Sequence, residues 1–464
     1  MTDYFPGSDM MSRKKYEIDM TQGSVLKNTI MFALPMIAGN LLQLMYNAAD
    51  MIVVSRWAGS NAMASVGATG SLSSLIVTLC MGLSIGASVV VSRNFGAGDK
   101  DGLHRAVHTS MLVGLISGLI AMVVGISLAR PLLILMGTPS GEVLEGAVLY
   151  MRLYFAGIPG TMVYNFGSAI LRSIGDTKRP LYILSATGVV NVVLNLVFVI
   201  NFHMGVAGVA IATMIANYIS AVAVVHMLVK ADGAYRLRLS ALRIYSKEFR
   251  EILCIGLPSA LQSSMFHIAN IIIQSTVNSF GAAAIAGCSA GANIEGFVYT
   301  AMHAFYTATL TGVSQNYGAK NEKRIYRTII TSVCCVAAVG VCLGAVMVVF
   351  SRPLLGIYIT DSAEAIEYGA MRLMISGLPY FLSGVMDVLT GSLRGIGYSG
   401  VAATNSLIGV CGVRLVWVWL ILPLHRTIGV LFLCWPVSWI IAITMHTITF
   451  LAVRKKTMSK MREG

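Results

Sequence analysis

The sequence predicts an all-α integral membrane protein in which twelve transmembrane helices form two pseudo-symmetric six-helix lobes. Hydrophobic residues make up 56% of the 464 residues and charged residues only 11%, whereas a soluble domain carries about 25% charged residues. Mean hydropathy is +0.76, and apolar residues occur in runs of roughly 20, the length that lets a helix cross a bilayer. The two halves of the chain also resemble each other. The composition excludes a soluble enzyme and a disordered chain.

The transmembrane helices are expected where long apolar runs lie between polar connections. Each run is long enough to cross the hydrocarbon core as a helix. In chain order, the predicted spans are residues 28–54, 64–92, 107–129, 143–171, 180–200, 206–229, 252–277, 284–314, 328–350, 365–393, 401–422 and 428–452.

The positive charges predict the orientation of these spans. Of the 33 Lys and Arg residues, 26 lie in the two tails and the even-numbered connections, four in the odd-numbered connections and three inside spans. Cytoplasmic connections carry the excess of positive charge, so both termini are expected in the cytoplasm. The net charge of +13 then reflects topology beside an anionic leaflet, and no nucleic-acid partner is expected. The chain has no Asn-x-Ser/Thr acceptor, which fits a bacterial cytoplasmic (inner) membrane.

An internal repeat relates the two halves at a shift of 222 residues. Residues 94–97 (Asn-Phe-Gly-Ala) align with 316–319 (Asn-Tyr-Gly-Ala), and residues 130–133 (Arg-Pro-Leu-Leu) are repeated at 352–355. Six spans per half give the two repeats the same orientation, an arrangement typical of alternating-access transporters. The predicted organisation is a cytoplasmic tail (1–27), a first lobe (28–229), a cytoplasmic linker (230–251), a second lobe (252–452) and a C-terminal cytoplasmic tail (453–464).

Polar residues at helical spacing inside the spans predict a cleft lined from both lobes. Unsatisfied polar groups are costly in lipid, so such stripes are expected to face the protein interior or a water-filled cavity. Methionine-rich and aromatic surfaces of this kind suit lipophilic cations. The candidate cleft residues are Gln43, Tyr46, Asn47, Asn165, His267, Asn270, Tyr299, Tyr306, Tyr380 and Ser383.

Three carboxylates lie far from any span end: Asp50, Glu295 and Asp387. A charge at the bilayer centre costs about 2.5 to 3.5 kcal/mol on insertion scales, so these acids are candidates for ion or substrate binding. The alternative is that they are protonated or paired with a buried arginine, for which Arg414 is a candidate. Arg372 is expected to face away from the polar stripe and to snorkel towards the membrane surface.

Asp50 has candidate companions in the fifth and sixth spans, namely Asn191, Asn195 and Thr213. Carboxylate, amide and hydroxyl oxygens are the ligands that hard cations such as Na⁺ prefer. The same set can hold a carboxyl that takes up and releases a proton, or it can serve as hydrogen-bonding contacts between helices. No other metal and no cofactor are expected. The eight cysteines all lie in spans and lack the spacing of metal ligands. They are expected to pack as small buried hydrophobic residues.

The sequence resembles the multidrug and toxic compound extrusion (MATE) family over roughly residues 23–453. The motifs that carry the resemblance are Ala-Leu-Pro at 33–35, Asn-Ala-Ala-Asp at 47–50, Phe-Gly-Ala-Gly-Asp at 95–99, Tyr-Met-Arg at 150–152 and Leu-Arg-Ser-Ile-Gly-Asp-Thr-Lys-Arg-Pro at 171–180. The resemblance implies a V-shaped, two-lobe fold that exports organic cations in exchange for Na⁺ or H⁺.

The resemblance also implies where the coupling ion binds. It places a site in the first lobe at Asp50, Asn191, Asn195 and Thr213. In other members a site in the second lobe uses an acid of the tenth span, matched by Asp387, with an acid of the seventh span. The seventh span has no acid here, and Glu295 of the eighth is a positional substitute.

The resulting prediction is a monomeric secondary multidrug exporter that exchanges lipophilic organic cations for Na⁺ or H⁺. One alternative is a flippase of the related lipid-linked oligosaccharide exporter group, which needs a basic cleft, whereas the interior here is expected to be acidic. Another is a membrane-embedded transferase, but the sequence has no HExxH motif. An ion channel is a third alternative, and no filter-like loop supports it.

Overall fold

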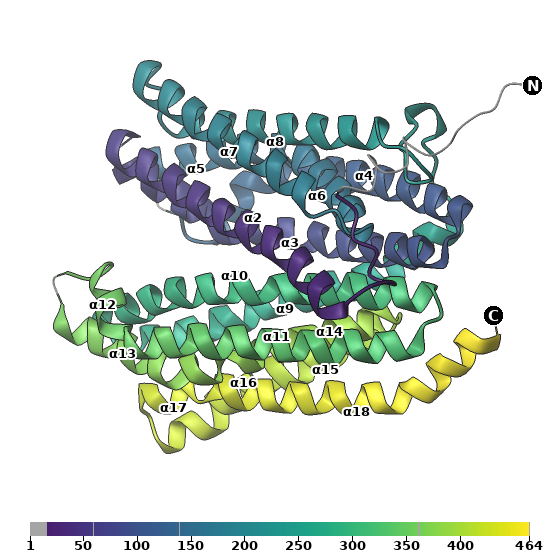
Figure 1. Ribbon diagram of the computed structural model, residues 1–464. Helices are drawn as coiled ribbons and strands as arrows, with labels where there is room; N and C mark the ends of the chain where they lie inside the picture. Colours follow the sequence, from purple (N-terminus) through teal and green to yellow (C-terminus); the bar gives the residue numbers. More distant parts are fainter. Residues whose placement is uncertain (1–15, 59, 139, 361, 464) are drawn as a thin grey trace, which may run out of the picture. The chain divides into compact units, whose positions relative to one another are not determined.

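The computed structural model describes residues 16–58, 60–138, 140–360 and 362–463, and these contain helices and connections but no β-strand. Figure 1 shows long helices running beside one another within each half of the chain. The principal helices are α2 (Val25–Val53), α3 (Ser60–Ala97), α4 (Lys100–Leu135), α5 (Glu142–Ala156), α6 (Ile158–Ser173), α7 (Lys178–Leu196), α8 (Gly205–Val229), α9 (Ser246–Asn278), α10 (Ala282–Gly318), α11 (Glu322–Val349), α12 (Ser351–Gly356), α13 (Ala363–Gly377), α14 (Phe381–Gly395), α15 (Ser399–Ser406), α16 (Val413–Val416), α17 (Ile428–Phe432) and α18 (Cys434–Glu463). Short 3₁₀ or π-helical segments join several of them: η1 (Val54–Ala58), η2 (Val197–Asn201), η3 (Leu239–Ala241), η4 (Leu378–Tyr380), η5 (Leu407–Gly412), η6 (Trp417–Ile421) and η7 (Leu422–Leu424).

Ten helical segments of the described chain are long and apolar enough to cross a membrane, and they coincide with ten of the twelve predicted spans. The span predicted at 143–171 forms two helices, α5 and α6, that meet at Gly157 just before Pro159. The span predicted at 284–314 lies within α10, a helix of 37 residues whose apolar character is interrupted by polar side chains such as Glu295. The predicted all-α membrane fold is confirmed.

The chain forms two compact units. The first unit comprises Ala38–Ala260 with the described residues before Met20, and the second comprises Met20–Ile37 with the residues from Leu261 onward. Within the first unit, α6 packs against α3, α4 and α8. Within the second unit, α10 packs against α11, α13 and α14. Each unit therefore has its own helical core, built around one central helix.

The opening helix of each repeat is divided between the two units. Helix α2 contains Pro35, and the boundary between units follows at Ile37. Helix α9 contains Pro258, and the boundary follows at Ala260. A proline inside a helix removes one backbone hydrogen bond and favours a bend at that point. The first unit thus includes the predicted linker at 230–251 and the first part of α9, and the second includes the first part of α2.

Equivalent glycines allow close helix crossings in both units. A Cβ atom on Gly118 of α4 would lie 2.8 Å from the Cα of Pro159, and one on Gly340 of α11 would lie 2.7 Å from the Cα of Phe381. The two pairs are related by the 222-residue repeat. Small residues let helix backbones approach closely in membrane proteins. The repeat seen in the sequence is therefore also a repeat of packing.

The turn before the third helix of each unit is repeated as well. The Asp99 side chain accepts a hydrogen bond from the backbone N–H of Gly102 at 2.8 Å, and Asn321 accepts one from the N–H of Arg324 at 3.2 Å. These side chains satisfy N–H groups that the first turn of a helix leaves unpaired. Both residues follow a position with positive φ, Gly98 and Lys320, so the matching motifs at 94–97 and 316–319 are built into the same turn.

Candidate functional site

A chain of hydrogen bonds in the first unit joins the four residues predicted around Asp50. The side-chain amide of Asn195 donates to Asp50 Oδ1 and, at 3.3 Å, to Asn191 Oδ1. The amide of Asn191 in turn donates to the Thr213 hydroxyl at 3.3 Å. Helices α2, α7 and α8 supply these side chains, and the spacing of one helical turn places Asn191 and Asn195 on the same face of α7. We call these four residues the Asp50 network.

The Asp50 network contains an oxygen atom without a hydrogen-bond donor. Asn195 has no exposed surface, and its Oδ1 atom has no donor among the described residues. A buried carbonyl oxygen normally accepts a hydrogen bond, and burying it without a donor costs free energy. This oxygen belongs to the side chain that binds the Asp50 carboxylate. The arrangement offers several oxygen atoms to a hard cation, or a carboxyl able to hold a proton.

Of the remaining first-unit candidates, Gln43, Tyr46 and Asn47 lie on α2 and Asn165 lies on α6. The Tyr46 hydroxyl donates to the backbone oxygen of Ser185 at 3.2 Å, and its ring occupies the space where Gly188 of α7 lacks a side chain. Gln43 and Asn47 are exposed, and Asn165 is partly exposed. The structure therefore places Tyr46 in the contact between α2 and α7. It gives Gln43, Asn47 and Asn165 no part in the Asp50 network.

A second group of polar side chains surrounds Asp387 in the second unit. The carboxyl of Asp387 on α14 faces the hydroxyl of Tyr299 on α10 and lies within electrostatic range of Arg394. Arg394 donates to the Tyr306 hydroxyl at 2.6 Å and to Gln262 Oε1 at 2.7 Å. Asp387, Tyr299 and Tyr306 were expected at the site. Gln262 was missed, because it lies in the apolar first part of its span.

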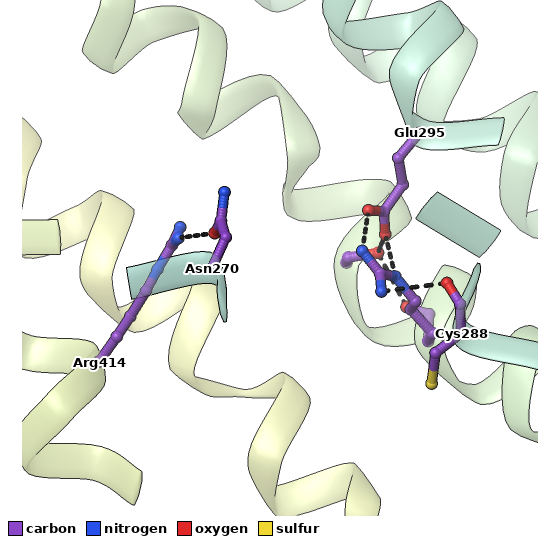
Figure 2. A network of polar contacts seen from close by, with 6 residues as sticks. Asn270, Cys288, Glu295 and Arg414 are labelled. Atoms are coloured by element: carbon purple, nitrogen blue, oxygen red, sulfur yellow. Dashed lines mark hydrogen bonds and ion pairs between the residues drawn. The ribbon is translucent and has the colours of Figure 1, made fainter. Parts of the chain in front are cut away.

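Glu295 forms a buried ion pair with Arg372 (Figure 2). Arg372 Nη2 lies 2.6 Å from Glu295 Oε2, and Arg372 Nε donates to Glu295 Oε1 at 3.1 Å. The Ser376 hydroxyl also donates to Oε1, at 2.6 Å, and Arg372 donates to the backbone oxygen of Cys288 at 3.2 Å. The ring of Trp435 covers the guanidinium at 4.5 Å. Both carboxylate oxygens are thus occupied by protein groups.

This ion pair corrects two expectations from the sequence. Arg372 does not snorkel, since it is only 8% exposed, and the partner of Glu295 is Arg372 and not Arg414. The cause is a helix break. The 3₁₀ turn η4 at Leu378–Tyr380 separates α13 from α14, so the two helices do not share one continuous face. The structure gives Glu295 a place inside the second unit, apart from the hydrogen bonds of Tyr299, Tyr306 and Arg394.

The other second-unit candidates are distributed around these two groups. Ser383 is buried and donates to the backbone oxygen of Tyr380 at 2.8 Å. Tyr380 is also buried and packs edge-on against Trp439, with ring centroids 5.4 Å apart. Asn270 is exposed and accepts a hydrogen bond from Arg414 Nη1 at 3.2 Å. His267 is partly buried on the same helix.

A buried histidine also escaped the sequence interpretation. His446 of α18 has no exposed surface, and its Nε2 atom lies 3.1 Å from the Thr390 hydroxyl and 3.2 Å from that of Ser406. The signal available in the sequence was a lone histidine in an apolar span. Its contacts join α18 to α14 and α15, the helices beside Asp387.

The interior of the second unit is more basic than expected. Three arginines, Arg372, Arg394 and Arg414, lie inside this unit beside two acids, the buried Glu295 and the partly buried Asp387. All three arginines are buried. The expectation of an acidic interior therefore does not hold for the second unit, where Arg372 was expected to reach the membrane surface but is buried.

Comparisons with known proteins agree with this architecture. The MatE family model matches residues 35–197 and again 258–420, one match in each half. "Probable multidrug resistance protein YpnP" of Bacillus subtilis is 28% identical over 82% of this chain and 84% of its own length. "Probable multidrug resistance protein NorM" of Thermotoga maritima is 25% identical over 80% of each chain. A solved outward-facing structure of a multidrug resistance MATE family transporter superposes with a TM-score of 0.86 at 23% identity, covering 97% of this chain and 99% of that one.

Proposed function

Because the chain belongs to the MatE family, we propose that it exports lipophilic organic cations in exchange for Na⁺ or H⁺ entering the cell. The family and the named relatives make it a multi-pass membrane transporter for multiple drugs, and not an enzyme. The proposal adds the charge of the substrate and the coupling ion. It further places the protein, as a monomer without a cofactor, in the bacterial cytoplasmic membrane with both termini in the cytoplasm.

The observation that carries this proposal is the Asp50 network. A carboxylate inside a membrane-spanning segment is costly unless it has a function or a charged partner. Among the described residues, Asp50 has no basic side chain in salt-bridge contact, and its carboxylate accepts a hydrogen bond from the neutral amide of Asn195. The unpaired Oδ1 of the same amide supplies a further ligand atom. Both features suit a site that takes up a small cation and releases it again.

The mechanism follows from charge neutralisation at Asp50. While the carboxylate is ionised, it attracts a cationic drug. When Na⁺ or H⁺ enters from outside and binds there, the negative charge is cancelled and the attraction for the drug is lost. A neutral site also avoids exposing a bare charge to low dielectric during the return step. The membrane potential contributes about 2.3 kcal/mol per charge per 100 mV to inward movement of the ion.

Replacement of the carboxylate tests this mechanism. In proteoliposomes loaded with a fluorescent lipophilic cation, Asp50→Asn should lower gradient-driven efflux about ten- to a hundredfold, because a charge-assisted interaction is removed. Imposing a pH gradient and a Na⁺ gradient separately identifies the coupling ion. The matched control is Asp101→Asn, which removes an exposed acid of the same unit and should leave efflux unchanged. Undiminished efflux by the Asp50 variant would refute the coupling role.

Asp387 extends the proposal to the second unit. Its carboxyl lies within electrostatic range of Tyr299 and Arg394, so it is a second place where ion binding can alter the charge of the interior. Its position matches the tenth-span acid that the family resemblance implies. The role of the predicted cleft residues in drug binding stays a prediction.

A further inference from the structure

Arg414 is a buried cation held only by neutral side chains. It lies on α16 in the middle of a predicted span and is 7% exposed. Its Nη1 donates to Asn270 Oδ1 of α9 at 3.2 Å, and its Nε donates to the Ser438 hydroxyl of α18 at 3.3 Å. Figure 2 shows the guanidinium pointing at the Asn270 amide. Three N–H groups of the five in the guanidinium have no acceptor among the described residues.

The acids of the second unit are already engaged. Glu295 is bound by Arg372 and by the Ser376 hydroxyl. Asp387 faces Tyr299 and is influenced by Arg394. Neither carboxylate is in salt-bridge contact with Arg414. The second unit buries three arginines, Arg372, Arg394 and Arg414, against two acids, Glu295 and the partly buried Asp387, so at least one of these arginines lacks an acidic partner.

A purely structural role explains Arg414 poorly. Arginine is among the most costly residues to place at the centre of a membrane helix. A neutral donor such as glutamine would join Asn270 and Ser438 without that cost. The hydroxyl and amide oxygens that contact Arg414 do not balance its charge, so the charge itself requires an explanation.

The side chain that accepts the Arg414 Nη1 hydrogen bond belongs to an exposed residue, Asn270 of α9. The Asn270 amide nitrogen and the unused guanidinium N–H groups are therefore donors on adjoining side chains. A planar fork of N–H donors matches the two oxygens of a carboxylate.

We propose that Arg414 and Asn270 form a recognition site for a carboxylate of the transported solute. This inference rests on the proposed export function. It specifies that the exported cations include amphoteric solutes, which carry a carboxylate as well as a cationic group. In this proposal the Asp50 network of the first unit interacts with positive charge, and the Arg414 site of the second unit binds negative charge.

A matched pair of dyes tests the site directly. The probes are a cationic xanthene dye with a free carboxylate and its methyl ester, each measured in gradient-driven efflux from proteoliposomes. Arg414→Gln should lower efflux of the free acid about tenfold relative to the ester, the factor expected when about 1.4 kcal/mol of charge-assisted hydrogen bonding is lost. Arg414→Lys keeps the charge without the planar fork and should recover part of the preference.

Asn270→Asp separates recognition from folding. The new carboxylate would neutralise Arg414 in place, so the thermal midpoint should stay the same or rise. Recognition of the free acid should nevertheless be lost, while efflux of the ester continues. If Arg414 only joined helices, this variant would affect both dyes equally or neither, and the proposal would be overturned.

The surface ion pair supplies the control. Arg352 pairs with Glu367 at 2.9 Å on an exposed face of the same unit, so Arg352→Gln removes one exposed positive charge that does not contact Arg414 and should leave the dye preference unchanged. Equal efflux of acid and ester by both wild type and Arg414→Gln would overturn the carboxylate site. Absence of gradient-driven efflux of the ester in wild type would instead overturn the proposed export function.

Discussion

Ionisable side chains buried within the spans differ in what holds them. Asp50 is held by an amide, Glu295 by a guanidinium and a hydroxyl, and Arg414 by an amide and a hydroxyl. Removing one member of a buried ion pair costs about 3 to 5 kcal/mol because it strands the other charge. The Glu295–Arg372 pair therefore stabilises a fixed structure, whereas neither Asp50 nor Arg414 has a salt-bridge partner among the described residues.

Asp176, outside the spans, gives a prediction for pH dependence. Its Oδ1 accepts the backbone N–H groups of Lys178 and Arg179 at 3.2 and 3.1 Å, and the side chain has no exposed surface. Burial raises the pKa of Asp176 from 3.8 to about 6, against the opposing effect of those hydrogen bonds and of Arg179. The folded state therefore binds this proton more tightly than the unfolded state, so the stabilisation is complete below about pH 4 and is lost as the pH rises through 6.

Asp176→Asn should remove this dependence while keeping a carbonyl oxygen for the two N–H groups. The stability of wild type relative to the variant should fall between about pH 4 and pH 7 by up to about 3 kcal/mol. Thermal unfolding of both proteins in detergent over that range measures the difference. A constant difference across the range would contradict the prediction.

At the scale of helices, the sequence predicted which side chains share a face only where the helix that carries them is unbroken. The Asp50 network was predictable because α2 and α7 run unbroken through their polar residues, so spacing alone placed Asn191 beside Asn195. The polar stripe from Ser376 to Arg394 crosses the 3₁₀ turn η4, and a break changes which residues share a face. Helical spacing could therefore not predict the ion pair between Glu295 and Arg372, because that pair depends on the packing of α10 against α13.

The close crossing at Gly340 gives a prediction about packing. A Cβ there would lie 2.7 Å from both Cα and Cβ of Phe381, so Gly340→Ala forces α11 away from its neighbour and should cost about 1 to 3 kcal/mol. The control is Gly296→Ala in α10, where a Cβ meets no atom within 4 Å and alanine favours the helix. Thermal midpoints in detergent should fall for the first variant only. Equal midpoints would show that the crossing is not tight.

For the whole molecule, the repeat and the charge distribution were both readable from the sequence. Motifs recur at a constant shift because equivalent turns and crossings recur, as at Asp99 and Asn321. The placement of the basic residues predicts cytoplasmic termini. The division of α2 and α9 between the units was not predictable, because sequence similarity identifies repeats and not the contacts that each segment makes.

Reporter fusions test the predicted topology. Alkaline phosphatase fused after the last residue should be inactive, since the enzyme needs the oxidising exterior for its disulfides, while a green fluorescent protein at the same place should fluoresce. Inserted in the connection at residues 201–205, the phosphatase should be active. An active C-terminal phosphatase fusion would show an odd number of spans or a reversed orientation.

The shared opening helices bear on how such a chain arose. If one repeat were once a separate protein, the present contacts imply that two copies exchanged their opening half-helices, as in a domain-swapped dimer. Fusion of the two genes would then have made that exchange permanent and freed each copy to change on its own. The Asp50 network of one half and the buried Arg414 of the other are differences of the kind that such a fusion permits.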